Sequence, residues 1–104
     1  MNSPGIMSKI SASLELMNGD RIVVVDRLDD PFSHSPDEMH RNLFRVSSVG
    51  EVVWQVGNYN HFGNSTFTNV YQKADGIFAH NFDGVEYEIV DVERGDVKPR
   101  ALTR

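Results

Sequence analysis

Apolar and polar residues alternate along most of this 104-residue chain. Residues 10–16, ISASLEL, change character at every position, and so do residues 85–89 of VEYEIV (85–90). Period two is typical of half-buried strands in an antiparallel sheet. Residues 21–28, RIVVVDRL, are apolar on both faces and predict a more central strand. In residues 10–16 the side expected to face the core consists of Ile10, Ala12, Leu14 and Leu16.

Residues 51–56, EVVWQV, continue the pattern. Strict alternation turns Val52, Trp54 and Val56 inward and leaves Glu51, Val53 and Gln55 outside. Trp54, the single tryptophan, is therefore expected in the core.

Glycine-containing pairs divide these runs. Asn18-Gly19, Asp75-Gly76 and Asp83-Gly84 favour tight hairpin turns, and Val49-Gly50 and Arg94-Gly95 add two corners. Together they predict an all-β fold of eight antiparallel strands in two four-stranded meanders, on either side of a longer loop at residues 57–65. Such meanders close as a barrel or pack as two facing sheets. The strands are expected near residues 10–17, 21–28, 42–48, 51–57, 66–73, 77–82, 85–91 and 96–102.

At most one short helix fits this plan. In SPDEMHRNLF, Ser35 can cap a helix, Pro36 suits its first position, and Glu38 completes a capping box around residues 36–41. The length suits a single domain over residues 9–104, with residues 1–8 as a disordered lead-in. Because that start has one lysine and a Pro-Gly break, no signal peptide is expected.

Composition restricts the possible chemistry. The chain has no cysteine, which excludes disulfides and thiolate ligands. The net charge of −5 and the pI near 5.2 disfavour duplex nucleic acid and anionic membranes as partners. A basic protein is the natural partner for an acidic chain, and this chain itself is expected to be a soluble cytoplasmic protein. No motif for catalysis, phosphate binding or a cofactor is found, so we expect no enzyme and no cofactor.

Two phrases carry a resemblance. GEVVWQV (50–56) and DGIFAHNFDGVEYEIVDVERGDV (75–97) resemble the strand-and-turn phrases of quinoprotein-type β-propeller repeats. They are also similar to small uncharacterised bacterial all-β proteins with an N-x-D-G-x-x-Y-x-I-D core. The resemblance covers about half of the chain and implies hairpins. A propeller needs at least four blades, whereas this chain has material for two, so no activity is carried over.

Residues 81–97 hold six acidic side chains. Glu86 and Glu88 share one face of a predicted strand, where two carboxylates can pair for acid–base work. Charge alternating with apolar residues is also what a half-exposed strand requires. We therefore interpret this stretch as a hairpin with a solvated face.

Histidines and carboxylates gather in residues 29–42. This composition can bind a divalent ion, but the spacing matches no established ligand pattern. A solvated connection is the preferred interpretation. The metal candidates are His34, Asp37, Glu38 and His40.

The loop at residues 57–65 is the strongest candidate for recognition. It joins asparagines with aromatic side chains, the chemistry of many binding loops. The set also includes His80 and Asn81. His80 is expected to be packed or half-exposed beside Phe78 and Phe82. The candidate binding residues are Asn58, Tyr59, His61, Phe62, His80 and Asn81.

Two functions remain open from the sequence. The first is a non-enzymatic interaction module, of the immunity or inhibitor type for example, that binds a basic protein through an edge strand or residues 57–65. The second is a small-ligand-binding barrel with a pocket near that loop. An unpaired edge also allows a homodimer instead of a monomer.

Overall fold

The computed structural model of this chain describes residues 10–25, 41–56, 66–82 and 84–102, and within them it is all-β. All eight expected strands are present. The helix expected around residues 36–41 lies outside the described residues except for Arg41, which is in a turn, and the lead-in at residues 1–8 lies outside them as well. The strands are β1 (Ile10–Glu15), β2 (Arg21–Val25), β3 (Leu43–Val46), β4 (Val52–Gln55), β5 (Phe67–Lys73), β6 (Gly76–Asn81), β7 (Val85–Asp91) and β8 (Asp96–Leu102).

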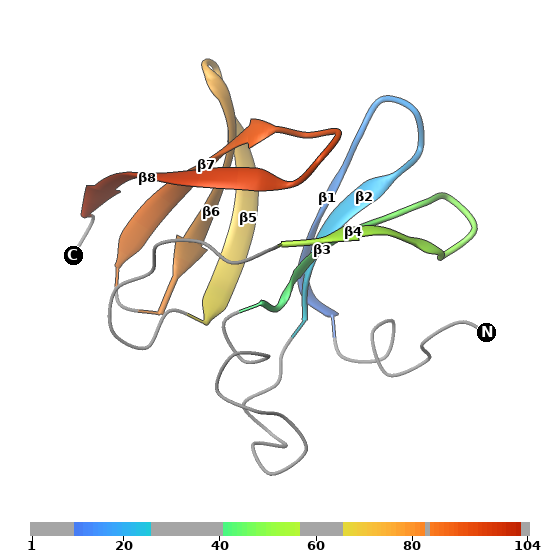
Figure 1. Cartoon of the computed structure of the whole chain (residues 1–104), viewed down its shortest axis with the longest axis horizontal. Helices are drawn as coiled ribbons and strands as arrows, with labels where there is room; N and C mark the ends of the chain where they lie inside the picture. The colour runs from blue at the N-terminus through green and yellow to red at the C-terminus, as the bar shows by residue number, and fades with distance from the viewer. Residues whose placement is uncertain (1–9, 26–40, 57–65, 83, 103–104) are drawn as a thin grey trace, which may run out of the picture.

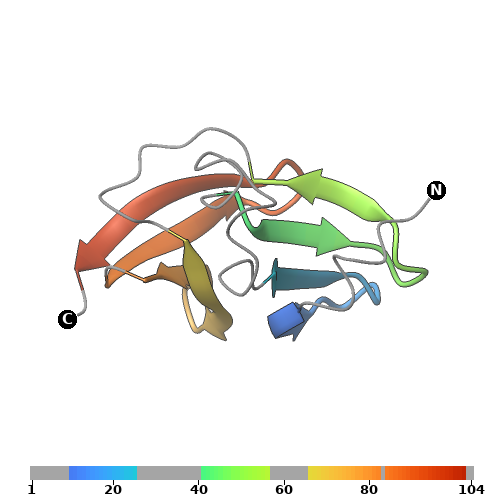
Figure 2. The same cartoon turned by 90° about the horizontal axis from the view of Figure 1, so that it is seen from below.

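The strands form two antiparallel meanders, β1-β2-β3-β4 and β5-β6-β7-β8, as the turn signals predict. No hydrogen-bonded ladder joins the two sheets among the described residues, so they do not close into a barrel. β1 and β5, one edge of each sheet, lie beside each other (Figures 1 and 2). The strands at the opposite edges, β4 and β8, are left without a neighbouring strand in this part of the chain.

One core lies between the sheets, built from the inward residues of both. Tyr87 is fully buried at its centre, and its ring meets the edge of Phe67 at 5.5 Å between centroids. Trp54 is buried here, which confirms its expected position. The first sheet supplies Ile22, Val24, Leu43, Trp54 and Val56, and the second supplies Phe67, Val70, Ala79, Val85, Tyr87 and Ile89.

The first sheet is apolar on its other face too. Val23, Val25, Phe44 and Val46 form a second buried cluster there, so β2 is buried on both faces, as predicted for a central strand. A register shift between Ile10 and Ala12 places Ile10 against this cluster. The prediction that Ile10 shares a face with Ala12 is therefore wrong, because alternation does not survive a bulge.

Asn42 links the two sheets through backbone groups. Its Nδ2 donates to the carbonyl oxygens of Val25 at 2.7 Å and Phe67 at 2.9 Å, and its Oδ1 accepts from the Phe67 N–H at 2.9 Å. The side-chain amide is buried, and both its nitrogen and its oxygen form hydrogen bonds. It therefore fixes the start of β5 against the end of β2.

Candidate functional site

The whole predicted binding loop, residues 57–65, lies outside the described residues. This applies to Asn58, Tyr59, His61 and Phe62, and equally to the metal candidates His34, Asp37, Glu38 and His40. In the described part, no three histidine or acidic side chains gather closely enough to hold a metal ion. The same part contains no helix with the length and apolarity needed to cross a membrane.

His80 and Asn81 lie on opposite faces of β6. His80 is half-buried and pairs with Glu86 of β7 on the outer face of the second sheet. Asn81 is buried on the inner face, where its Oδ1 accepts from the Val85 N–H at 2.8 Å. Its Nδ2 has no hydrogen-bond acceptor in the described structure. Because successive residues of a strand alternate, these two side chains do not belong to one site.

Glu86 is buried within a polar cluster on the outer face of the second sheet. The Tyr71 hydroxyl donates to its Oε2, and the Lys73 Nζ lies 3.0 Å from its Oε1. Phe78 supports both neighbours, stacking on Tyr71 and lying 4.3 Å below the Lys73 ammonium group. The expectation of a solvated face is thus wrong at Glu86, because these side chains reach over it from β5 and β6.

The environment of this cluster does not favour acid–base catalysis. Hydrogen bonds from Tyr71 and then Lys73 hold the pKa of Glu86 below its ordinary value. Burial, with the Glu86 hydrogen bond, raises the pKa of Tyr71 well above its ordinary value. Both groups are therefore stabilised in the protonation states they already have near pH 7, whereas an acid–base catalyst titrates near the working pH.

Glu88 does not pair with Glu86. Its Oε1 accepts from the Arg100 Nε at 2.7 Å and forms an ion pair with the Nη2 of the same residue at 2.6 Å. The two glutamates suggested by the sequence as an acid–base pair thus contact different cations on β5 and β8.

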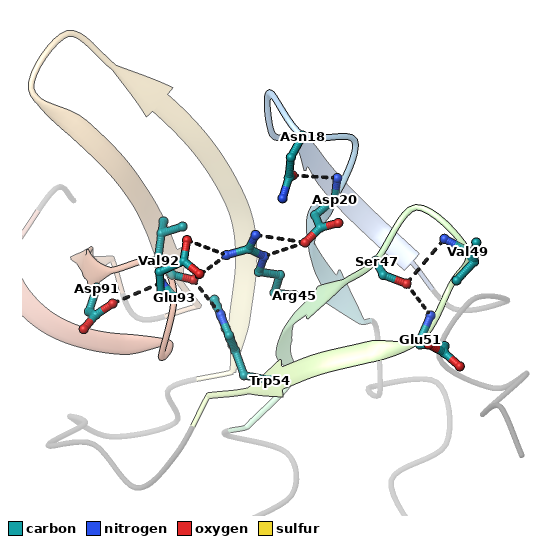
Figure 3. Close-up of polar contacts among 10 residues, drawn as sticks. All are labelled: Asn18, Asp20, Arg45, Ser47, Val49, Glu51, Trp54, Asp91, Val92 and Glu93. Carbon is teal, nitrogen blue, oxygen red and sulfur yellow. Dashed lines mark hydrogen bonds and ion pairs between the residues drawn. The ribbon is translucent and has the colours of Figure 1, made fainter.

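Arg45 and Trp54 attach the β7–β8 turn to the first sheet (Figure 3). The Arg45 guanidinium lies 2.9 Å from the Asp20 carboxylate, with only 6% of the arginine side chain exposed. Its Nη1 donates to the Val92 carbonyl at 3.0 Å, and the Trp54 Nε1 donates to the same oxygen at 2.7 Å. This arrangement satisfies a buried cation and holds the turn, which is a structural role.

Gly95 completes this contact. It has a φ of +85°, and a Cβ at this position would lie 2.6 Å from the Trp54 ring. Glycine is thus required both by the left-handed conformation and by the approach of the ring.

The exposed apolar residues on the first sheet gather along β4 and its turn. A bulge makes Val53 an extra residue without a partner on β3, while Val52 pairs with Val46. Val52 is 46% exposed and Val53 is 48% exposed. The prediction that Val52 lies inside with Trp54 is therefore wrong, because the bulge shifts the alternation between them. We use the name β4 edge for the backbone groups of β4 that point away from β3 together with four side chains, those of Val49, Val52, Val53 and Gln55.

The β3–β4 turn, which leads into this edge, is held by local hydrogen bonds. The Ser47 Oγ accepts from the backbone N–H groups of Val49 at 3.3 Å and Glu51 at 3.1 Å (Figure 3). Val49 is largely exposed at its tip. The neighbouring β1–β2 turn, with exposed Met17, lies alongside, since a Cβ on Gly19 would be 3.5 Å from Ser48.

The other open edge, β8, has a different character. Pro99 lies in the middle of the strand, paired with Tyr87, and Lys98 and Arg100 flank it. A proline removes a backbone donor, and charged side chains resist the approach of another strand. β4 contains neither proline nor a charged residue. Of these two strands, β8 has both features that hinder the pairing of another strand, and β4 has neither.

Comparisons with protein-family models, curated proteins and solved structures found no match for this chain. The resemblance to propeller-type repeats thus stays a prediction.

Proposed function

We propose that this protein is a non-enzymatic interaction module that binds another protein through the β4 edge. One observation carries the proposal: β4 exposes Val52 and Val53 on an edge without proline or charge, whereas β8 carries Pro99 between two cations. Natural proteins usually protect open edges, so an unprotected apolar edge indicates a surface that is covered by a partner.

In the described residues, the centre of the outer face of the second sheet is already occupied by side chains that contact one another. Its aromatic ring Phe78 is buried beneath Tyr71 and Lys73, and its two glutamates are paired with cations. A partner there would have to displace bonds that are already made, whereas apolar side chains at the β4 edge gain from being covered.

Capture with matched variants tests this function. Tagged wild-type, Val53→Lys and Val90→Lys proteins are incubated with lysate of the source cells, washed, and the bound proteins quantified by mass spectrometry. Val90 lies on β7 and is 47% exposed, so it matches Val53 at 48% in residue type and exposure. Thermal melting of both variants is measured first, so that only folded proteins are compared.

The proposal expects one stoichiometric protein with the wild type and Val90→Lys, reduced at least tenfold with Val53→Lys. Equal recovery with both lysine variants, or no stoichiometric protein at all, would contradict it.

A further inference from the structure

We infer that the β4 edge accepts an extended, basic-flanked segment of its partner as a fifth strand of the first sheet. This inference rests on the proposed function and specifies the form and charge of the bound segment. It follows from three features of the described residues: the free backbone groups of β4, the exposed valines, and the carboxylates around them.

The backbone of β4 has groups directed away from β3. The Val56 N–H donates to the Leu43 carbonyl at 2.8 Å, and the next pair along the ladder is Gln55 with Phe44. Antiparallel ladders alternate between pairs that exchange hydrogen bonds and pairs that do not. The N–H and C=O of Gln55 therefore point outward, where an added strand would meet them. This is the β-augmentation mode of peptide recognition.

The exposed side chains determine the apolar part of the segment. Val52 and Val53 lie on the edge itself and would be covered by side chains at alternate positions of an added strand. The bulge at Val53 and the four-residue length of β4 limit regular pairing. A short segment, about as long as β4, is therefore expected.

The surrounding charge determines the flanks. The β7–β8 turn lies against Trp54 of β4 through the Val92 carbonyl (Figure 3). Among the described residues on and beside β4, four acidic side chains stand against two cations that are not buried, and the Glu93 side chain is 83% exposed. Lysine or arginine at the ends of the segment would complement this surface. A second copy would instead bring two acidic surfaces together. The acidic residues are Glu51, Asp91, Glu93 and Asp96. The cations are Arg94, 3.9 Å from Asp96, and Arg41, whose Nε donates to the Val56 carbonyl at the end of β4.

Two substitutions at Gln55 separate strand addition from side-chain docking. Gln55→Pro removes the outward N–H, which an added strand needs and the β3–β4 ladder does not use. Gln55→Ala keeps that N–H. Both lose the bond from the Gln55 Nε2 to the Arg41 carbonyl, which is 2.8 Å long, so the pair differs in the backbone. Thermal melting is used to check that both variants are folded before binding is compared.

A random dodecapeptide library displayed on phage is selected on the wild-type protein. The enriched peptides are then measured on both Gln55 variants. We expect alternating apolar residues with lysine or arginine at the flanks, and affinity at least tenfold weaker for Gln55→Pro than for Gln55→Ala. Amide exchange at Gln55 should slow when such a peptide binds, because its N–H becomes hydrogen-bonded.

Three results would overturn the inference. The first is equal binding of the peptides to both Gln55 variants, and the second is no enrichment of basic-flanked apolar peptides. The third is a wild-type dimer in sedimentation that Gln55→Pro abolishes, because a second copy would then be the occupant of the edge. If lysate capture still depends on Val53 while either of the first two results is found, the proposed function stands and strand addition is wrong.

Discussion

Arg45 is the clearest case in which one side chain holds distant parts of the chain together. Its guanidinium contacts Asp20 near β2 and the Val92 carbonyl in the β7–β8 turn. Removing one partner of a buried ion pair leaves the other charge without compensation, which costs about 3–5 kcal/mol.

We therefore expect Arg45→Met to lower the free energy of unfolding in urea by about 3–5 kcal/mol. Arg100→Met is the control, because the Arg100–Glu88 pair is more exposed, at 44% and 22% of the two side chains. Exposed pairs contribute less than about 1 kcal/mol. Equal effects of the two substitutions would contradict the bridging role of Arg45.

Glu86 links stability to pH. Its pKa is lowered in the folded protein by hydrogen bonds from Tyr71 and Lys73, so its ionised form stabilises the fold above the unfolded value near 4.5. That stabilisation is lost as the pH falls through the folded pKa.

Glu86→Gln should therefore lower the free energy of unfolding at pH 7 by about 1–2 kcal/mol, because the hydrogen bonds to a neutral amide are weaker than those to the carboxylate. At pH 3 the loss should be smaller. Urea unfolding at both pH values measures the difference. A penalty of the same size at pH 3 would show that the charge of Glu86 is not what Tyr71 and Lys73 stabilise.

At the scale of elements, the strands could be predicted because their signals are local. Alternation and Gly-containing pairs identify each hairpin within a few residues of sequence. The bulges between Ile10 and Ala12 and at Val53 could not be predicted, because they depend on how a neighbouring strand pairs. For the β4 edge the signal was present but ambiguous: Val52, Val53 and Trp54 are three apolar residues in a row, and a half-buried strand cannot bury all three.

The burial of Glu86 has the same explanation. Tyr71 and Lys73 lie more than ten residues away on β5, which is two strands from β7 in the sheet. A pattern read along β7 alone therefore gives no sign of them. The candidates in residues 26–40 and 57–65 lie outside the described residues and stay predictions.

The β7–β8 turn offers a direct test of how elements dock. Gly95 and Gly50 have nearly equal φ values, +85° and +89°, but a Cβ at Gly50 would meet no atom within 4 Å. Alanine in this conformation costs about 1 kcal/mol at either site. At Gly95 the clash with Trp54 should add about 1–3 kcal/mol and change the tryptophan fluorescence. Equal losses for Gly95→Ala and Gly50→Ala in urea unfolding would contradict the docking of the turn.

At the scale of the whole molecule, the two sheets form one structural unit. They share the core around Tyr87, and Asn42 and Arg45 bond across them. Unfolding should therefore be a single transition. Trp54, the single tryptophan, reports by fluorescence on the contact between the first sheet and the β7–β8 turn, and circular dichroism reports on all strands. Two separate transitions by these probes would show that the sheets unfold independently.

The central claim is that this molecule presents the β4 edge to another protein. The most direct measurement places a photo-crosslinking amino acid at position 53 or at position 90 and irradiates the source cells. We expect one discrete crosslinked protein from position 53 and none from position 90. No adduct from position 53, or the same adducts from both positions, would contradict it.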